Sequence, residues 1–304
     1  MADVKLPAID LKRILAGAQL PALPQSAIRL LELSQDPENG PAEFALPIEA
    51  DPGLTGQVLR FVNSSYFGFS REISSVKLAI TLVGIRTIKN FSLWSAVFSL
   101  MPNPKCGPFD LKLLWQDSLR RALFARGTAQ LLGAKEPEDA FSAALLQDMA
   151  VPLLAKEASP LYAKLIQARD NGKVRLSHIE QRMLGWTHAE AGGMMARQWN
   201  LPDAFAVLVE HHHEVERLAA DPKADPAKLA VALSALLPAA ADAQWHECAQ
   251  LDALYQQLAL PGAPELAAAL QRVDEQFHEF APVLKLAEPG SSLVERYAHE
   301  TALA

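Results

Sequence analysis

The sequence predicts an all-α protein. Apolar residues recur at three- and four-residue steps along the chain, and the alternation that is typical of β-strands is scarce. Hydrophobic residues make up 50% of the 304 residues and charged residues 21%, which is the composition of a globular protein rather than a disordered one. Two proline-containing segments interrupt the helical pattern, so we expect a two-lobed helical bundle with a C-terminal extension.

The first lobe is assigned to residues 1–108. Its helices are expected after Asp10 and over residues 25–34, 75–83 and 85–101. A further helix begins at Asp51, because an aspartate followed by a proline is typical of a helix N-terminus. Asn63 and Ser64 end this helix, and together with Asp51 they are candidates for an interface.

A proline-rich segment separates the two lobes. Residues 101–108, MPNPKCGP, contain three prolines and a glycine, which neither a helix nor a central strand tolerates. The second lobe is assigned to residues 109–220. Its helices are expected over residues 111–132, capped by Asp110, over 138–155, over 159–171, and from 201 to the histidines at 211–213. Ser177 to Glu180 and Thr187 to Glu190 both match the S/T-x-x-E capping box.

The C-terminal extension is assigned to residues 221–304. It opens with DPKADPAK and continues as an alanine-rich sequence, with helices expected near 227–237, 247–259 and 264–280. From about Glu288 onward we expect a loose tail.

The charge balance and the cysteines exclude several classes of protein. With 28 basic and 35 acidic residues the formal charge is −7, which argues against a general nucleic-acid binder. Cys106 and Cys248 form no CxxC pair, which excludes a disulfide scaffold and a thiolate zinc site. No apolar run is long enough for a membrane span, and the first residues lack the apolar core of a signal peptide. We therefore expect a cytoplasmic protein without a membrane partner.

Histidine and aspartate carry the candidate chemistry. Asp148 lies in the apolar segment FSAALLQDMAVPLL, where a carboxylate is costly unless it is hydrogen-bonded, paired or bound to metal. His188 begins a capped helix, and His211 to His213 end another. Each has an ordinary explanation: a bond to a helix end for Asp148, a solvated position for His188, and the helix dipole for the histidine run. Together they could instead hold a divalent metal in a bundle core, and spacing alone does not decide between these readings.

Other catalytic motifs are absent from the sequence. It contains no P-loop, no GxGxxG dinucleotide fingerprint and no GxSxG nucleophile elbow. Cys106 lies in the proline-rich segment and is a poor candidate for a nucleophile. The run RRALFAR at 120–126 is either a solvated face or a patch for a phosphate or an acidic partner.

Several segments resemble a known family. DPGLTGQVLRFVNSSYF and AITLVGIRTIKN resemble the N-terminal lobe of the HDOD domain, a bacterial signal-output domain related to HD-type metal phosphohydrolases. Three segments of the second lobe also resemble helices of this family and occur in the same order: LWQDSLRRALFA, AALLQDMAVPLL and HAEAGGMMARQWNLPDAFAVLVEHHHE. The resemblance covers roughly residues 10–215 and implies an all-helical fold with an HD-like second lobe.

The departures from the hydrolase pattern carry the functional argument. By resemblance, Asp148, His188, His212 and His213 are the surviving, vestigial metal ligands. The first histidine of the pattern reads Asp117, and the histidine of the His-Asp pair reads Gln147. The later aspartate falls near Ser234, and Asp242 lies eight residues further on.

The resemblance therefore implies a non-catalytic signal-transduction module. We expect it to bind a signalling protein in trans, or a small ligand such as a nucleotide, and to need no cofactor beyond a weakly bound divalent metal. The alternative is a metal-dependent phosphohydrolase that acts on a nucleotide or a cyclic dinucleotide, because HD hydrolysis requires a metal to activate water. A purely structural role is the third hypothesis.

Overall fold

A computed structural model describes residues 10–17, 20–258 and 262–303. These residues contain helices and no strand, as the sequence predicts. The first nine residues lie outside this description, and the expectation about a signal peptide rests on them. Residue 259, where one helix is expected to end, also lies outside it. None of the described helices has both the length and the apolar character that crossing a membrane requires.

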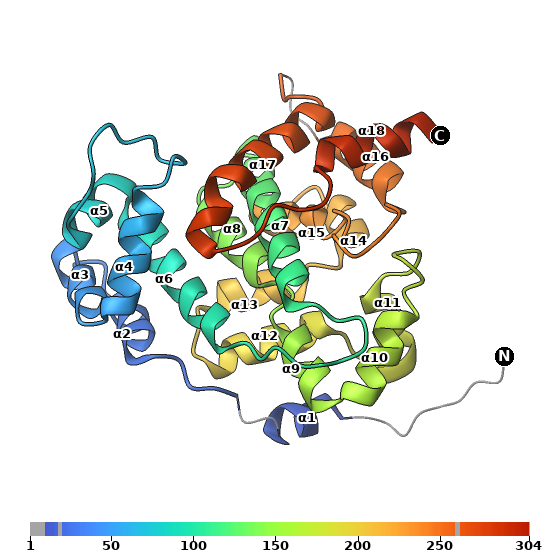
Figure 1. Cartoon of the computed structure of the whole chain (residues 1–304), viewed down its shortest axis with the longest axis horizontal. Helices are drawn as coiled ribbons and strands as arrows, with labels where there is room; N and C mark the ends of the chain where they lie inside the picture. Colours follow the sequence, from blue (N-terminus) through green and yellow to red (C-terminus); the bar gives the residue numbers. More distant parts are fainter. Residues whose placement is uncertain (1–9, 18–19, 259–261, 304) are drawn as a thin grey trace.

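The first lobe gathers on one side of the molecule (Figure 1). It consists of α2 (Gln25–Leu33), α3 (Pro41–Glu49), α4 (Pro52–Val62), α5 (Val76–Val83) and α6 (Ile85–Leu100). Asp51 caps α4, since its carboxylate accepts the Leu54 N–H at 3.0 Å, which confirms the predicted cap. The preceding helix α1 (Leu11–Gly17) instead contacts the second lobe.

The second lobe is built around the long helix α7 (Leu111–Leu131), which begins at the Asp110 cap as predicted. The other helices are α8 (Pro137–Leu146), α9 (Ala150–Glu157), α10 (Ser159–Gln167), α11 (Leu176–Leu184), α12 (His188–Gln198), α13 (Asp203–Glu210) and α14 (Val215–Ala219). Residues 101–110 between the lobes are not helical, as their prolines predict.

The C-terminal extension packs on α7 (Figure 1). It contains α15 (Pro226–Ser234), α16 (Cys248–Leu258), α17 (Leu266–Phe280), the 3-10 helix η1 (Ala281–Leu284) and α18 (Leu293–Leu303). Phe280, at the end of α17, contacts Phe61 of α4 and Phe141 of α8, with ring centroids 5.2 and 5.8 Å apart. The extension therefore joins the cores of both lobes.

The structure corrects the prediction of one helix over 138–155. The segment forms α8 and α9, separated by a turn at Gln147, Asp148 and Met149. Pro152 gives the physical reason, because it lacks an N–H and is best tolerated in the first turn of a helix. A new helix that begins at Ala150 places Pro152 in that first turn. The break also removes Asp148 from regular helix, where the sequence placed it.

Two further local expectations are wrong. Ser177 lies inside α11 and caps nothing, while Glu180 of the same motif is fully buried. The tail after Glu288 is not loose, because α18 forms there. Asp274 on α17 accepts the Leu293 and Val294 N–H groups at 2.9 and 3.0 Å, so a distant helix supplies the cap.

Candidate metal centre

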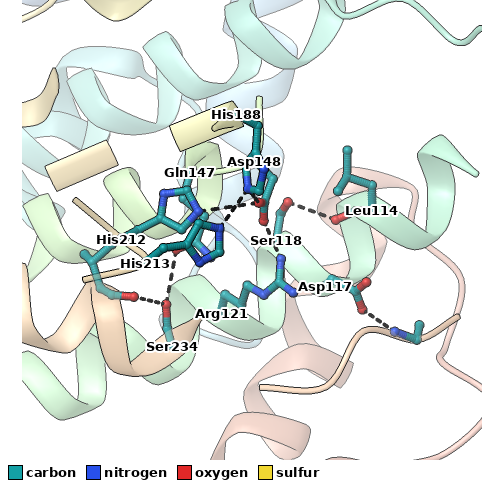
Figure 2. A network of polar contacts seen from close by, with 12 residues as sticks. Leu114, Asp117, Ser118, Arg121, Gln147, Asp148, His188, His212, His213 and Ser234 are labelled. Carbon is teal, nitrogen blue, oxygen red and sulfur yellow. Dashed lines mark hydrogen bonds and ion pairs between the residues drawn. The ribbon is translucent and has the colours of Figure 1, made fainter. Parts of the chain in front are cut away.

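Four side chains from three separate segments converge in the second lobe (Figure 2). Asp148 comes from the turn between α8 and α9, His188 from the first residue of α12, and His212 and His213 from the turn after α13. One ligand atom from each of them lies within 4.8 Å of all the others. We call these four residues the candidate metal centre. His211 lies outside it, because its Nδ1 contacts the Val207 carbonyl at 2.9 Å.

Local structure places each of these side chains. Thr187 caps α12 by accepting the Glu190 N–H at 3.4 Å, and so fixes His188 at the start of that helix. The α8–α9 turn directs Asp148 toward the same point. Close packing of α12 on α13 then brings the histidine pair near, since a Cβ on Gly192 would lie 2.8 Å from Val209.

A buried carboxylate orients His188. Its Nδ1 lies 2.6 Å from Glu180 Oε2, and Glu180 itself is held by the Tyr162 hydroxyl and by the His188 N–H. This leaves His188 Nε2 directed at Asp148 Oδ1, 3.1 Å away. Burial opposes the imidazolium, but Glu180 and Asp148 outweigh it and raise the pKa of His188 to about 10. His188 therefore carries a positive charge between two carboxylates.

The histidine pair is neutral. His212 donates from Nδ1 to the Val209 carbonyl at 2.6 Å, so its Nε2 presents a lone pair, 3.7 Å from Asp148 Oδ1. That Nε2 is buried and has no hydrogen-bond partner among the described residues. Burial, the neighbouring His212 and the charged His188 hold the pKa of His213 well below its usual range. The neutral His213 accepts at Nε2 from His188, at 2.9 Å.

Arg121 of α7 forms an ion pair with the second carboxylate oxygen of Asp148 (Figure 2). Both side chains are nearly buried, with 13% and 8% of their surface exposed. Burial alone would favour the neutral acid, but Arg121 and the imidazoles hold the pKa of Asp148 well below its usual range. Two carboxylates, Asp148 and Glu180, are thus balanced by one guanidinium and one imidazolium without an external cation.

The positions that depart from the hydrolase pattern bond to one another or to backbone. Gln147 Oε1 lies 3.3 Å from the Ser234 hydroxyl, so two of the three positions that resemblance assigns to lost ligands contact each other. Asp117 accepts the Ala240 N–H at 2.8 Å. Asp242 forms an ion pair with Arg169 and lies apart from the candidate metal centre.

A cleft of about 140 Å³ opens beside the candidate metal centre. Asp148, His188 and His213 line it, and so do several residues of the segment 237–244. Two further lining arginines are already paired, Arg169 with Asp242 and Arg175 with Glu247. Arg296 of α18 binds the carbonyls of Ala239 and Asp242 at 2.9 and 3.0 Å, so the C-terminal extension fixes this segment.

The donor atoms of the candidate metal centre fit a divalent transition metal. Imidazole and carboxylate are suitable ligands, and a histidine held through its other nitrogen by a carboxylate is the usual support for a metal ligand. The unpartnered Nε2 of His212 faces Asp148, so two acceptors meet where a cation would satisfy both. A metal at this point competes with Arg121 for Asp148 and requires His188 to lose its proton.

Three residues of the site were not singled out by the sequence. Glu180 matched a capping box, Arg121 belonged to an arginine-rich run with an ordinary explanation, and Tyr162 carried no signal. Their roles depend on α7, α10 and α11 meeting in space, which no local pattern records.

The candidate interface residues form hydrogen bonds inside the first lobe. Asn63 exchanges two hydrogen bonds with the Ile73 backbone, at 2.7 and 2.8 Å, and the Ser64 hydroxyl donates to the Phe61 carbonyl. Asp51 also accepts from the Ser26 hydroxyl. A role for these residues at an interface stays a prediction.

Comparison with protein families identifies the fold that carries this site. The family model of the HDOD domain matches residues 20–215, which is more than half of the chain. The chain belongs to the HDOD domain family. The match ends just after the histidine pair, so it includes the whole candidate metal centre and leaves out the C-terminal extension.

Individual relatives of this HDOD protein are distant. An uncharacterized protein of Treponema pallidum (strain Nichols) is 22% identical over 197 residues, which cover 64% of this chain and 38% of the relative. The chain thus spans well under half the length of that curated relative.

Solved structures show the same fold. An HDOD domain protein with unknown function from Geobacter sulfurreducens is 22% identical, with a TM-score of 0.63 over 96% of this chain and 92% of the other. A protein of Shewanella amazonensis SB2B named "Putative phosphohydrolase" is also 22% identical, with a TM-score of 0.60 and coverage of 94% and 93%. At this identity the likeness establishes the fold alone.

Proposed function

We propose that this HDOD protein is a non-catalytic signal-transduction module in which an arginine has replaced the metal of an HD-type site. The observation that carries the proposal is the buried ion pair between Arg121 and Asp148. The guanidinium binds Oδ2 of the carboxylate whose Oδ1 faces His188 and His212, and it completes the charge balance of the site. The module then acts by binding, with a signalling protein in trans or a small ligand as its partner.

The positions of the lost ligands support the proposal. Gln147 and Ser234 contact each other, and Asp117 accepts a backbone N–H, so each has acquired a structural hydrogen bond. HD-type hydrolysis needs a bound metal that turns water into a nucleophile at neutral pH. With Arg121 in place, the protein supplies a fixed cation that has no exchangeable water to activate.

A metal-dependent phosphohydrolase is the second candidate. It is favoured by the four donor atoms within 4.8 Å and by the adjoining cleft. Its substrate would be a nucleotide or a cyclic dinucleotide, with phosphate groups directed toward Arg169 and Arg175, which line the cleft. Both arginines would first have to leave their carboxylate partners.

Metal titration separates the two candidates. Calorimetry with Mn²⁺ and Zn²⁺ should detect weak or no binding to the wild type, and clearly tighter binding to Arg121→Met, which removes the cation but keeps the length of the side chain. Arg121→Lys is the matched control, since it keeps a positive charge and should bind metal as weakly as the wild type. Equal affinities in all three proteins would contradict the role assigned to Arg121.

Activity is the second readout. The wild type should not hydrolyse bis(p-nitrophenyl) phosphate or cyclic dinucleotides above background when manganese, iron or zinc is added. Metal-dependent turnover that disappears in Asp148→Ala would overturn the proposal and establish the phosphohydrolase.

Binding without turnover completes the test. Affinity capture from a bacterial lysate, with the wild type immobilised, should recover a specific signalling protein, and titration with cyclic dinucleotides tests the small-ligand form of the proposal. A protein that neither captures a partner nor binds such a ligand would favour the purely structural hypothesis.

A further inference from the structure

A second cavity lies between the two lobes and shares no lining residue with the cleft beside the candidate metal centre. Its volume is about 260 Å³, close to the lower end of the roughly 300–1,000 Å³ of small-molecule sites. One wall is α6 of the first lobe, and the other is formed by α8, by residues 201–202 and by α13 of the second lobe. We call it the inter-lobe cavity. Such positions between domains are preferred places for ligands.

The α6 wall changes from charged to apolar along the helix. Arg86, Lys89, Asn90, Leu93 and Trp94 all line the cavity, and their spacing puts them on one face of the helix. The charged and amide side chains occupy the N-terminal part of this face. Leu93 and Trp94, both buried, occupy the C-terminal part.

The opposite wall repeats this polarity in the same direction. Asp139 lines the cavity near the start of α8, Ser142 lines it near the middle, and Leu146 lines it at the end. Asp139 binds Arg86 at 2.8 Å, so the polar ends of α6 and α8 face each other. Phe205 and Leu208 of α13 add further apolar surface. The inter-lobe cavity is therefore amphipathic, with one polar end and one apolar end.

Lys89 is the unpaired charge at the polar end. It is half-buried, and no described carboxylate oxygen lies within the 4.0 Å of an ion pair. Arg86, in contrast, is bound to both Glu136 and Asp139. Burial lowers the pKa of Lys89 although Asp139 partly opposes this, which is the behaviour of an ammonium group that lacks a close anion.

Trp94 adds a second unsatisfied group. Its indole nitrogen is buried and has no hydrogen-bond partner among the described residues, although the indole N–H is a donor that usually finds one when buried. Of the charged side chains that line the cavity, Arg86 and Asp139 are paired with each other, so Lys89 is the one without a close partner. The single carboxylate of a monoanion gives Lys89 that partner, whereas a dianion such as a phosphate monoester brings a second negative charge near Asp139.

We propose that the inter-lobe cavity binds a small amphipathic carboxylic acid, with its carboxylate at Lys89 and its alkyl or aromatic body between Trp94 and Phe205. Such a ligand touches α6 of one lobe and α13 of the other, and so links ligand binding to the arrangement of the lobes. The inference is independent of the state of the candidate metal centre. It would supply one concrete small ligand for the proposed binding module, and its failure leaves capture of a partner protein untouched.

Three probes of one chain length test the charge preference. Octanoate, octanol and octylammonium are titrated into the full-length protein and followed by calorimetry. Octanoate should bind at least about tenfold more tightly than octanol, the ratio expected for one charge-assisted hydrogen bond. Octylammonium should not bind. Equal binding of octanoate and octanol, or no binding of octanoate, would overturn the proposal.

Two substitutions locate the site. Lys89→Gln should remove the preference for octanoate over octanol and leave the affinity for octanol unchanged. Its control is Lys77→Gln, at an exposed lysine of α5, which should keep that preference. Ala204→Trp places a large side chain at an exposed lining position and should abolish binding of both probes. Its control is Ala42→Trp on α3, which is also exposed and does not line the cavity.

Circular dichroism of each variant shows that the helical fold is kept, since all four substitutions are at exposed or half-buried positions. Octanoate binding that survives Ala204→Trp would place the ligand elsewhere and refute the assignment. Binding lost in Ala42→Trp or in Lys77→Gln as much as in the cavity variants would do the same.

Discussion

The candidate metal centre and the inter-lobe cavity both contain charged groups in apolar surroundings, but these charges are paired in the first region and one is left unpaired in the second. In the candidate metal centre the charges of Asp148 and Glu180 are balanced by Arg121 and His188 at hydrogen-bonding contact. In the inter-lobe cavity Lys89 has no close anion and the Trp94 indole N–H has no partner among the described residues. The charges of the first region are paired internally, and only the lone pair of His212 Nε2 is left without a partner among the described residues, whereas the second region leaves the charge of Lys89 for a ligand.

Removal of Asp148 should have the largest effect. Asp148→Ala leaves the Arg121 guanidinium buried without its anion, and breaking such a pair costs about 3–5 kcal/mol of unfolding free energy. Asp139→Ala, next to the inter-lobe cavity, breaks an ion pair whose side chains are 44% and 38% exposed, and should cost about 0–1 kcal/mol. Urea unfolding measures both. Similar losses in the two variants would mean that Arg121 is solvated in the folded state.

Asp117 should make stability depend on pH. Burial raises the pKa of Asp117 to about 6, against the attraction of Arg121 and the Ala240 N–H. The folded-state pKa lies above the usual 3.8, so stability is lost as the pH rises from about 4 to about 6. Asp117→Asn keeps the acceptor and removes the charge. It should stabilise the protein by up to about 3 kcal/mol above pH 6.

The comparison of Asp117→Asn with the wild type is made by urea unfolding at several pH values. Other titrating groups contribute to both proteins, so only the difference between them is assigned to Asp117. The gain should vanish near pH 4. A gain that does not change between pH 4 and pH 7 would exclude titration of Asp117 as its cause.

A substitution of Tyr162 tests how much its hydrogen bond to Glu180, the carboxylate that orients His188, contributes to stability. Tyr162→Phe removes the hydroxyl that donates to Glu180 and should cost about 1.5–3 kcal/mol, the range for a hydrogen bond to a charged group. Tyr255→Phe is a matched control, because the buried Tyr255 hydroxyl has no hydrogen-bond partner among the described residues. Thermal melts of both variants give the comparison, and an equal loss in each would contradict the role of Tyr162.

The smallest effect is expected in the first lobe, where a single cap is changed. Asp51→Ala removes the acceptor of the Leu54 N–H and should cost about 1 kcal/mol. Glu49→Ala, at an exposed position just before it, should change the melting temperature little. A loss from Asp51→Ala that is no larger than that of the control would show that α4 is held by packing alone.

The sequence was sufficient for features that depend on neighbouring residues. The caps at Asp51, Asp110 and Thr187, the break at residues 101–110 and the all-helical pattern follow from local backbone chemistry, and the structure contains each of them. The HDOD family was identified from motifs whose residues are contiguous, and the family model confirms it. The sequence also named the four residues that the structure brings together, although their function stays a proposal.

Tertiary structure decided what those residues can do. The helix α18 depends on a cap supplied by Asp274 from another helix. Arg121 lies 27 positions before Asp148, and the contact that makes it an internal cation arises only when α7 packs beside the α8–α9 turn. Caps and periodicity are read from a few adjacent residues, whereas charge compensation requires partners that only the folded chain brings within hydrogen-bonding distance.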